Sequence, residues 1–161
     1  MRKLIFCFLC LIVIAAPLTA FGQTGDVPLM RAVRPNLVGG ELGGRAILYS
    51  LNYERFVTPK VGIGAGLMGI GVSEGGVFLI PLYVSFTPIG NVHSLYLSGG
   101  YTIAGAAADE WGTVESTGFG TAAIGYLYHS EGGFYVKPTI TLLFIEDNFL
   151  ALPGIALGGS F

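Results

Sequence analysis

Charged residues are scarce in this sequence. Asp, Glu, Lys and Arg together make up 11% of the 161 residues, whereas an ordinary soluble domain carries roughly 25%. Hydrophobic residues make up 52% of the chain. The length allows one domain, and so few charges cannot cover a water-facing surface. Much of the molecule's surface therefore needs an apolar environment.

The N-terminal segment accounts for part of this apolar excess. Two basic residues precede an apolar run at residues 4–14, and a small-residue step follows at residues 20–22. This arrangement is typical of a secretory signal peptide that is cut before Gln23. The alternative is a membrane anchor, but the apolar run is shorter than the ~20 residues that a spanning helix needs. We therefore expect residues 1–22 to be a cleaved signal peptide.

Cysteine is missing from the rest of the chain. Both cysteines, Cys7 and Cys10, lie inside the predicted signal peptide, so the mature chain would have no thiol and no disulfide although it is exported. From Gln23 onward there are ten acidic and six basic residues, a net charge of −4. An acidic exported chain is a poor nucleic-acid binder, and we expect no nucleic-acid partner.

Long uninterrupted hydrophobic runs are absent after residue 23. Gly or Pro interrupts every candidate, as in "VGIGAGLMGIGV" at residues 61–72, which excludes a transmembrane helix there. The recurring pattern is alternation with a period of two, which is typical of a strand whose faces have different surroundings. In "AILYSLNYERF" one face holds Ile47, Tyr49, Leu51 and Tyr53, and the other holds Ser50, Asn52 and Glu54.

The same alternation recurs in two later segments, and it has an unusual composition. The apolar faces hold Leu95, Leu97, Tyr101 and Ile103 in one segment, and Phe134, Val136, Pro138, Ile140, Leu142 and Phe144 in the other. The opposite faces carry small or polar residues and few charges. A soluble barrel would have its apolar face inside and a charged face outside. The pattern here favours a narrow lumen lined by small side chains and an outer face in contact with lipid.

Seven turn signals divide the chain into eight segments of roughly 9 to 15 residues, and about 9 to 11 suffice to cross a bilayer as a tilted strand. The turns are Gly43-Gly44 and residues 58–60, 73–76, 88–91, 107–117, 129–133 and 146–148. Backbone polar groups in lipid must all be paired, so the strands must close on themselves. We predict an all-β, closed, antiparallel, eight-stranded transmembrane up-and-down β-barrel over residues 36–161.

The first of these segments is the weakest. Residues 37–42 could continue into residues 45–56 as one strand, which would leave seven. Such a strand would be about 70 Å long at ~3.4 Å per residue, far longer than a membrane requires. Bacterial single-chain barrels also usually have an even number of strands, which favours eight. Residues 23–35 would be a periplasmic lead-in, either disordered or folded as a plug.

These features resemble small bacterial outer-membrane β-barrel proteins, the class that includes the membrane domain of the major outer-membrane protein A. The resemblance rests on the signal peptide, the eight alternating segments and the closing "IALGGSF", while "LYSLNYERF" and "GYLYHSEGGFYVKP" are similar to a subgroup of such barrels. In that family the last strand ends in an aromatic residue that the barrel-assembly machinery recognises, and Phe161 matches this pattern. The resemblance implies a monomer in the outer membrane, with outer-membrane lipids and that machinery as partners.

This orientation sends the last strand down to the periplasm. The turns at Gly43-Gly44 and residues 73–76, 107–117 and 146–148 would then face outside. The charged residues in the turns after residue 70 are all acidic, namely Glu74, Asp109, Glu110, Glu115, Glu146 and Asp147. Such acids could bind divalent cations, but their spacing matches no calcium loop. We predict solvated loops and no metal site.

Inside the predicted barrel, a few polar residues fall at similar depth. Asn52 and Glu54 lie near the periplasmic end of one strand, and Lys137 lies at a similar level on another. A buried lysine without a partner is costly, so we predict a structural ion pair between Glu54 and Lys137. A proton or ion path is the alternative, although an eight-stranded interior is normally filled by side chains.

A catalytic centre is not expected. His129, Ser130 and Glu131 are adjacent, so their side chains point in different directions and cannot form the hydrogen-bonded chain of a nucleophilic site. His93 has no acid near it in its strand, and the glycine-rich stretches lack the residues of a phosphate-binding loop. We predict no catalytic residue and no cofactor. The expected role is structural or surface interaction, with a small pore or a lipid-modifying enzyme as alternatives.

Overall fold

The computed structural model describes residues 29–72, 75–108, 115–146 and 148–161. The predicted signal peptide and the tip of the longest outer turn lie outside this part of the chain. Eight strands follow one another, and they are β1 (Asn36–Gly43), β2 (Tyr49–Phe56), β3 (Val61–Val72), β4 (Gly75–Phe86), β5 (His93–Ala108), β6 (Glu115–His129), β7 (Phe134–Ile145) and β8 (Asn148–Ser160). A short helix, α2 (Met30–Val33), precedes them, and a 3-10 turn, η1 (Gly44–Ala46), joins β1 to β2.

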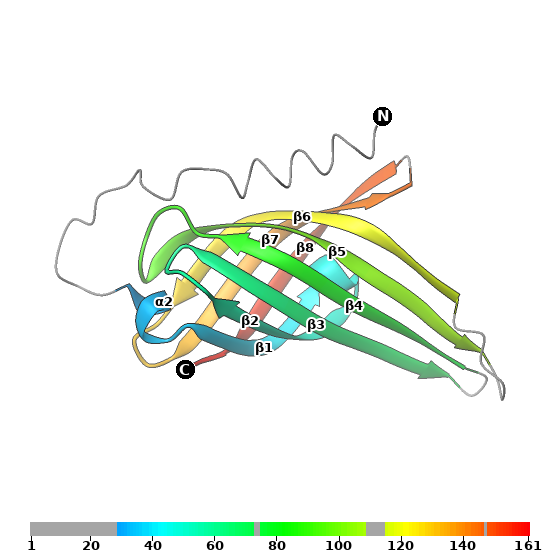
Figure 1. Cartoon of the computed structure of the whole chain (residues 1–161), viewed down its shortest axis with the longest axis horizontal. Coiled ribbons are helices and arrows are strands. Elements are labelled where there is room, and N and C mark those ends of the chain that lie inside the picture. The colour runs from blue at the N-terminus through cyan, green and yellow to red at the C-terminus, as the bar shows by residue number, and fades with distance from the viewer. Residues whose placement is uncertain (1–28, 73–74, 109–114, 147) are drawn as a thin grey trace.

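The strands form a closed barrel in which each pairs antiparallel with its neighbours in the chain, and β1 pairs with β8 (Figure 1). This confirms the predicted eight-stranded up-and-down barrel, with two strands rather than one in the first part of the chain. At the seam, Leu37 lies opposite Ser160 and Gly43 lies opposite Gly154. Phe161 follows the last residue of β8, and its backbone exchanges two hydrogen bonds of 3.0 Å with the backbone of Asn36. The aromatic terminus therefore completes the seam.

The chain reverses between β1 and β2 at two glycines. Gly43 and Gly44 have φ values of +71° and +68°, which glycine adopts without steric cost. The sequence predicts that this turn lies on the outer side of the membrane. The structure folds it into the lumen, where Arg45 and Ala46 are fully buried. The sequence did not predict this inward fold.

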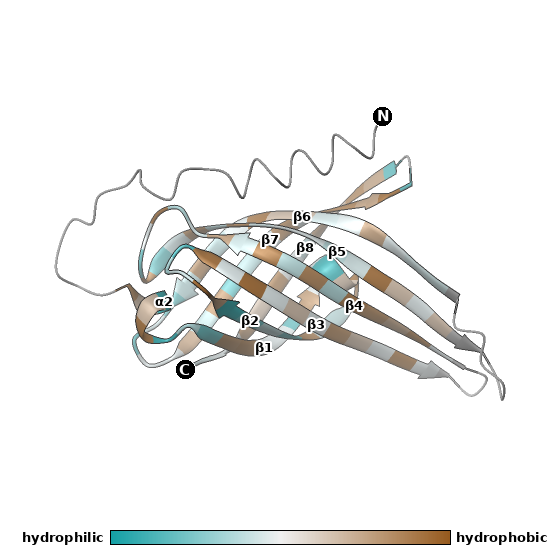
Figure 2. Cartoon of the chain, viewed as in Figure 1, coloured by the Kyte–Doolittle hydropathy of each residue, from teal (hydrophilic) through white to brown (hydrophobic). Residues whose placement is uncertain are grey.

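Inward and outward positions alternate as the sequence predicts. Buried and exposed residues alternate without a break along β2 and with few exceptions along β7, and the predicted faces of β5 are confirmed. Figure 2 shows the result as alternating brown and pale bands along the strands. Two apolar clusters fill the lumen. One, with Leu37 and Phe56, lies toward α2, and the other, with Met68 and Leu79, packs against Ala46 of η1.

The strands differ in length. β1 and β2 have eight residues each, whereas β5 has 16 and β6 has 15. The longer strands project past the others at the end of the barrel opposite α2 (Figure 1). The connections at the α2 end are residues 57–60, 87–92 and 130–133, and both Asn36 and Phe161 lie there.

Two neighbouring glycines of β1 test how tightly the interior is filled. A Cβ at Gly39 would overlap the Leu157 carbonyl oxygen and the Tyr135 hydroxyl, whereas a Cβ at Gly40 would meet nothing nearer than the Ser50 carbonyl oxygen at 3.9 Å. We expect Gly39→Val to lower the free energy of unfolding by about 1–3 kcal/mol and Gly40→Val to change it by less than about 0.5 kcal/mol. Urea unfolding in lipid vesicles, followed by gel mobility, measures both. Equal losses would contradict this account.

Candidate functional site: the barrel lumen

Besides Arg31 at the barrel end, four charged side chains of the described residues are buried in the lumen, each at most 3% exposed. They form two ion pairs, Lys137 with Glu54 at 2.6 Å and Arg45 with Glu41 at 3.2 Å. The first pair joins β2 to β7, and the second joins β1 to η1. The predicted pair between Glu54 and Lys137 is confirmed. Two of these four residues are positive and two are negative, so their charges cancel.

Glu54 is the centre of a dense set of contacts. Besides the Lys137 ammonium, its carboxylate accepts a short hydrogen bond from the Ser85 hydroxyl and longer ones of 3.4 Å from the hydroxyls of Tyr83 and Tyr96. The Lys137 ammonium also lies 4.5 Å from the centre of the Tyr96 ring. Both charges are thus held by several partners each, as a buried ion pair requires.

Arg45 connects the second pair to the first. One guanidinium nitrogen donates to both oxygens of Glu41, and another donates to the Tyr96 hydroxyl at 3.1 Å and to the Ser98 hydroxyl at 2.6 Å. The guanidinium also lies 4.1 Å from the centre of the Tyr83 ring. Because Tyr83 and Tyr96 contact both ion pairs, the four charges belong to one network, which we call the lumen network.

Asn52 faces the lumen as predicted and joins this network. Its amide nitrogen donates to Glu41 at 3.0 Å and to the Ser50 hydroxyl at 2.8 Å. The sequence analysis missed Glu41 and Arg45. The alternation along β1 places Glu41 on the same face as Leu37, so the period of two could have identified it. No local signal predicts that Arg45 turns inward, because it lies in a turn.

The three adjacent residues of "HSE" do not converge. The His129 imidazole contacts the Ser160 hydroxyl at 2.7 Å, the Ser130 hydroxyl accepts from the Phe134 backbone, and Glu131 is exposed. His93 lies on the outer face beside the Tyr126 hydroxyl. In the part of the chain that the structure describes, neither histidine has a carboxylate among its hydrogen-bond partners. The structure thus gives no geometric support for a Ser/His/acid centre.

The acidic turns fall mostly outside the described residues. This applies to Glu74, Asp109, Glu110 and Asp147. Within the four described ranges, no three His, Cys, Asp or Glu side chains gather where they could hold a metal ion. Nor does any helix of these ranges have the length and apolar character needed to cross a membrane.

Residues 29–35, which we call the mouth segment, lie at the end of the barrel where β1 begins and β8 ends. Arg31 is almost fully buried and donates to the carbonyl oxygens of Pro59, Gly90 and Asn91 at 2.7 to 3.1 Å, and to the Ser94 hydroxyl at 2.6 Å. Burial lowers the pKa of its guanidinium to about 10, so Arg31 stays charged at neutral pH. Arg31 thus ties the described part of the predicted lead-in to this end of the barrel.

Comparison with known proteins supports the fold. No protein-family model and no curated protein matches the sequence. Among solved structures, the N-terminal β-barrel domain of Pseudomonas aeruginosa OprF aligns over 80% of this chain and 98% of its own length, with 15% identity and a TM-score of 0.60. Ail, the attachment invasion locus protein of Yersinia pestis, in complex with the heparin analogue sucrose octasulfate, aligns over 78% and 96%, with 15% identity and a TM-score of 0.48.

The molecule is thus a closed, eight-stranded, antiparallel barrel with a charged and filled lumen. Its fold is that of the OprF barrel domain. The predicted likeness to small eight-stranded barrels is confirmed for the fold.

The lumen network allows a test of charge pairing. In Lys137→Met, Glu54 stays buried without its cation, and we expect the free energy of unfolding to fall by about 3–5 kcal/mol. The double variant Glu54→Gln/Lys137→Met removes both charges, so we expect it to regain a large part of that loss. Urea titrations of both variants in the same vesicles compare them. A double variant no more stable than the single one would refute charge pairing as the cause.

The mouth segment allows a second test. Arg31→Ala removes four hydrogen bonds, and we expect the amides of Ala32, Val33 and Arg34 to exchange with solvent roughly tenfold faster or more, because each hydrogen bond to a charged group contributes about 1.5–3 kcal/mol. Arg34→Ala is the control, since within the described residues Arg34 donates a single 3.3 Å bond, to the Ser160 carbonyl oxygen. Hydrogen-deuterium exchange by mass spectrometry measures both. Equal exchange in the two variants would show that Arg31 does not hold the mouth segment in place.

Proposed function

We propose that the protein is an integral protein of the bacterial outer membrane, with lipid against its outer face and a filled lumen. The observation that carries this proposal is the apolar exterior. Large hydrophobic side chains are exposed on every strand, among them Leu51 at 72%, Ile124 at 55% and Ile140 at 50%. An apolar surface that encircles a molecule is a liability in water and is expected in hydrocarbon.

The spacing of aromatic residues supports this environment. Phe134 and Phe144 stand on the outer face near opposite ends of β7, and Tyr101 and Phe144 both lie opposite Gly120. The two phenylalanines are ten positions apart, which corresponds to about 34 Å of strand at ~3.4 Å per residue. At a strand tilt of about 35–45° this spans roughly 24–28 Å across the membrane, close to the ~25 Å apolar band of outer-membrane barrels.

The orientation follows from the ends of the barrel. Outer-membrane barrels extend further on the outside than on the periplasmic side. Here the long strands β5 and β6 project at the end opposite α2, so we assign the α2 end, with the mouth segment and Phe161, to the periplasm. The projecting ends of β3 to β6 would then face outside. This assignment agrees with the resemblance of the last strand to those that the barrel-assembly machinery recognises.

The contents of the lumen support a structural or surface-interaction role rather than transport. Each of the four charges of the lumen network has a partner of opposite sign, the turn η1 occupies the outer half, and Arg31 ties the mouth segment across the periplasmic end. A continuous aqueous path would have to displace these groups. We therefore infer that the barrel stabilises the membrane and presents its outer loops.

Two measurements test this function. The membrane fraction should show heat-modifiable gel mobility, because a folded barrel resists detergent until it is boiled. In planar bilayers the folded protein should show no steady ohmic conductance. A mature chain that stays folded and monodisperse in detergent-free buffer would overturn the membrane assignment, and a steady conductance would overturn the filled lumen.

A further inference from the structure

A groove crosses the outer face of β1, β2 and β3. It has a volume of about 470 Å³, and the outward side chains that form it are Val38, Leu51, Tyr53 and Leu67, with Gly40 and Ala65 between them. Gly40 lies opposite Leu51, and Ala65 lies opposite Tyr53. The groove exists because Leu51 and Tyr53 each face a small residue on one of the two neighbouring strands.

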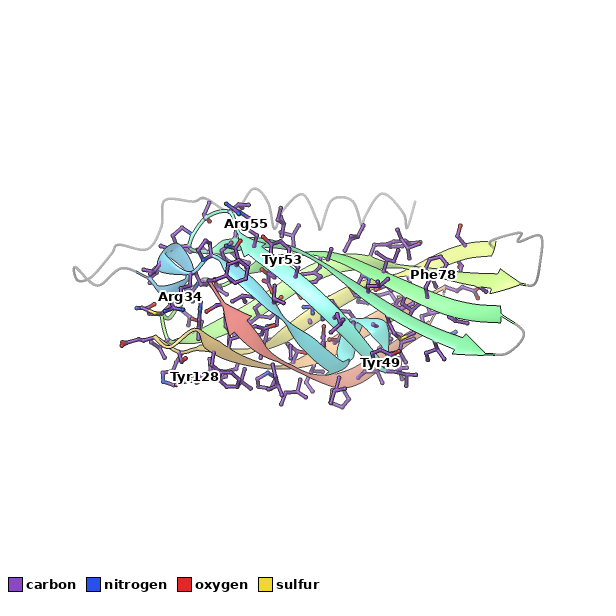
Figure 3. All side chains as sticks on the ribbon, turned by 90° about the horizontal axis from the view of Figure 1, so that it is seen from below. Arg34, Tyr49, Tyr53, Arg55, Phe78 and Tyr128 are labelled. Carbon is purple, nitrogen blue, oxygen red and sulfur yellow. The ribbon has the colours of Figure 1, made fainter. Side chains whose placement is uncertain are left out.

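A positive charge stands at the periplasmic end of this groove. Arg55 occupies the next outward position of β2 after Tyr53, and it lies opposite Ile63, whose side chain is also exposed. Figure 3 shows Tyr49, Tyr53 and Arg55 along this part of the barrel, with Arg55 near the end at which Arg34 also lies. A cation on an apolar outer face is costly unless it reaches the headgroup region.

Arg55 is positioned by its neighbours. The amide oxygen of Asn36 accepts a 2.8 Å hydrogen bond from the Tyr53 hydroxyl and a 3.3 Å bond from the Arg55 guanidinium, while the Asn36 amide nitrogen donates to the Phe161 carbonyl oxygen. A guanidinium has five N–H groups in a planar fork that fits phosphate oxygens. Within the described residues, Arg55 uses one of its nitrogens. The remaining donors are exposed beside the groove.

Among the described residues, the outward-facing side chains at this end of β1 and β2 include Arg55 and no acid. The exposed acid Glu131 belongs to the turn between β6 and β7, across the barrel from β2 and β3. Among the described outward-facing side chains at the groove end, the charge is therefore positive, which favours an anion.

We propose that this groove and Arg55 bind one phospholipid of the periplasmic leaflet, an inference that rests on the proposed membrane location. The Arg55 guanidinium holds the phosphate, and one acyl chain lies in the groove and points toward the membrane centre. Four residues separate Arg55 from Leu51, about 13 Å of strand at ~3.3 Å per residue, so the groove accommodates the upper part of an acyl chain. A net-negative headgroup such as that of phosphatidylglycerol is favoured over a zwitterionic one because of the surrounding positive charge.

Native mass spectrometry of the folded barrel, released from detergent micelles that contain either phosphatidylglycerol or phosphatidylcholine, tests this site. We expect the wild type to retain one phosphatidylglycerol in preference to phosphatidylcholine, and Arg55→Gln to weaken that binding roughly tenfold, or about 1.4 kcal/mol. Arg34→Gln is the matched control, because it removes the same charge from the same end without touching the groove. It should change binding less than about twofold.

A second variant tests the groove independently of charge. Ala65→Phe fills the groove from the lipid side and leaves Arg55 in place, so we expect it to weaken phosphatidylglycerol binding severalfold as well. The site is overturned if the wild type shows no preference between the two lipids, if Arg34→Gln and Arg55→Gln lose binding equally, or if Ala65→Phe binds as the wild type does. Each sample is first shown by heat-modifiable mobility to be a folded barrel, and should Arg55→Gln not fold, the wild-type preference and Ala65→Phe decide. A chain that never inserts overturns the proposed function, whereas an inserted barrel without lipid preference overturns only this site.

Discussion

The closed ring of backbone hydrogen bonds is the constraint on which the rest of the structure depends. Eight strands pair in chain order, and β1 pairs with β8, so no strand edge is left open along the seam. A barrel of eight strands has an interior just wide enough to be filled by side chains. Every inward residue must therefore fit a narrow space, and every inward charge must find its partner within it. The two ion pairs of the lumen network are a consequence of this closure.

The small inward residues have the same cause. Gly62, Gly64 and Gly66 of β3 face the lumen, and a Cβ at Gly64 would overlap the Tyr83 ring. A Cβ at Gly100 would overlap the backbone and the Cβ of the same tyrosine. Space left by glycine is thus occupied by the tyrosines that hold Glu54, Arg45 and Lys137. The glycine-rich stretch that resembles a phosphate-binding loop is instead a packing device, as its lack of the other loop residues indicated.

The limits of sequence reasoning here are physical. The ion pair between Glu54 and Lys137 could be predicted from the sequence. The period of two fixes the face of the strand on which each residue lies, and the turn positions fix its approximate depth in the barrel. The contacts of Arg45 and Arg31 could not be predicted, because both lie outside the strands, where no periodicity states which way a side chain points. The contact of His129 with Ser160 joins residues 31 positions apart, and it depends on the register between strands. The contacts of Asn36 could not be predicted either. Its partners Tyr53, Arg55 and Phe161 come together only when the barrel closes.

The sequence by itself determined the strand count, the two faces of each strand and the apolar character of the outer faces, because alternation and composition can be read from each segment alone. The tertiary structure decided how the ends of the barrel are closed. The turn η1 folds inward because Glu41 offers a partner to Arg45, and the mouth segment is held because three backbone carbonyls converge on Arg31. It also decided the outer groove, whose walls belong to three strands. Such features depend on distances between segments that only the register of the closed ring sets.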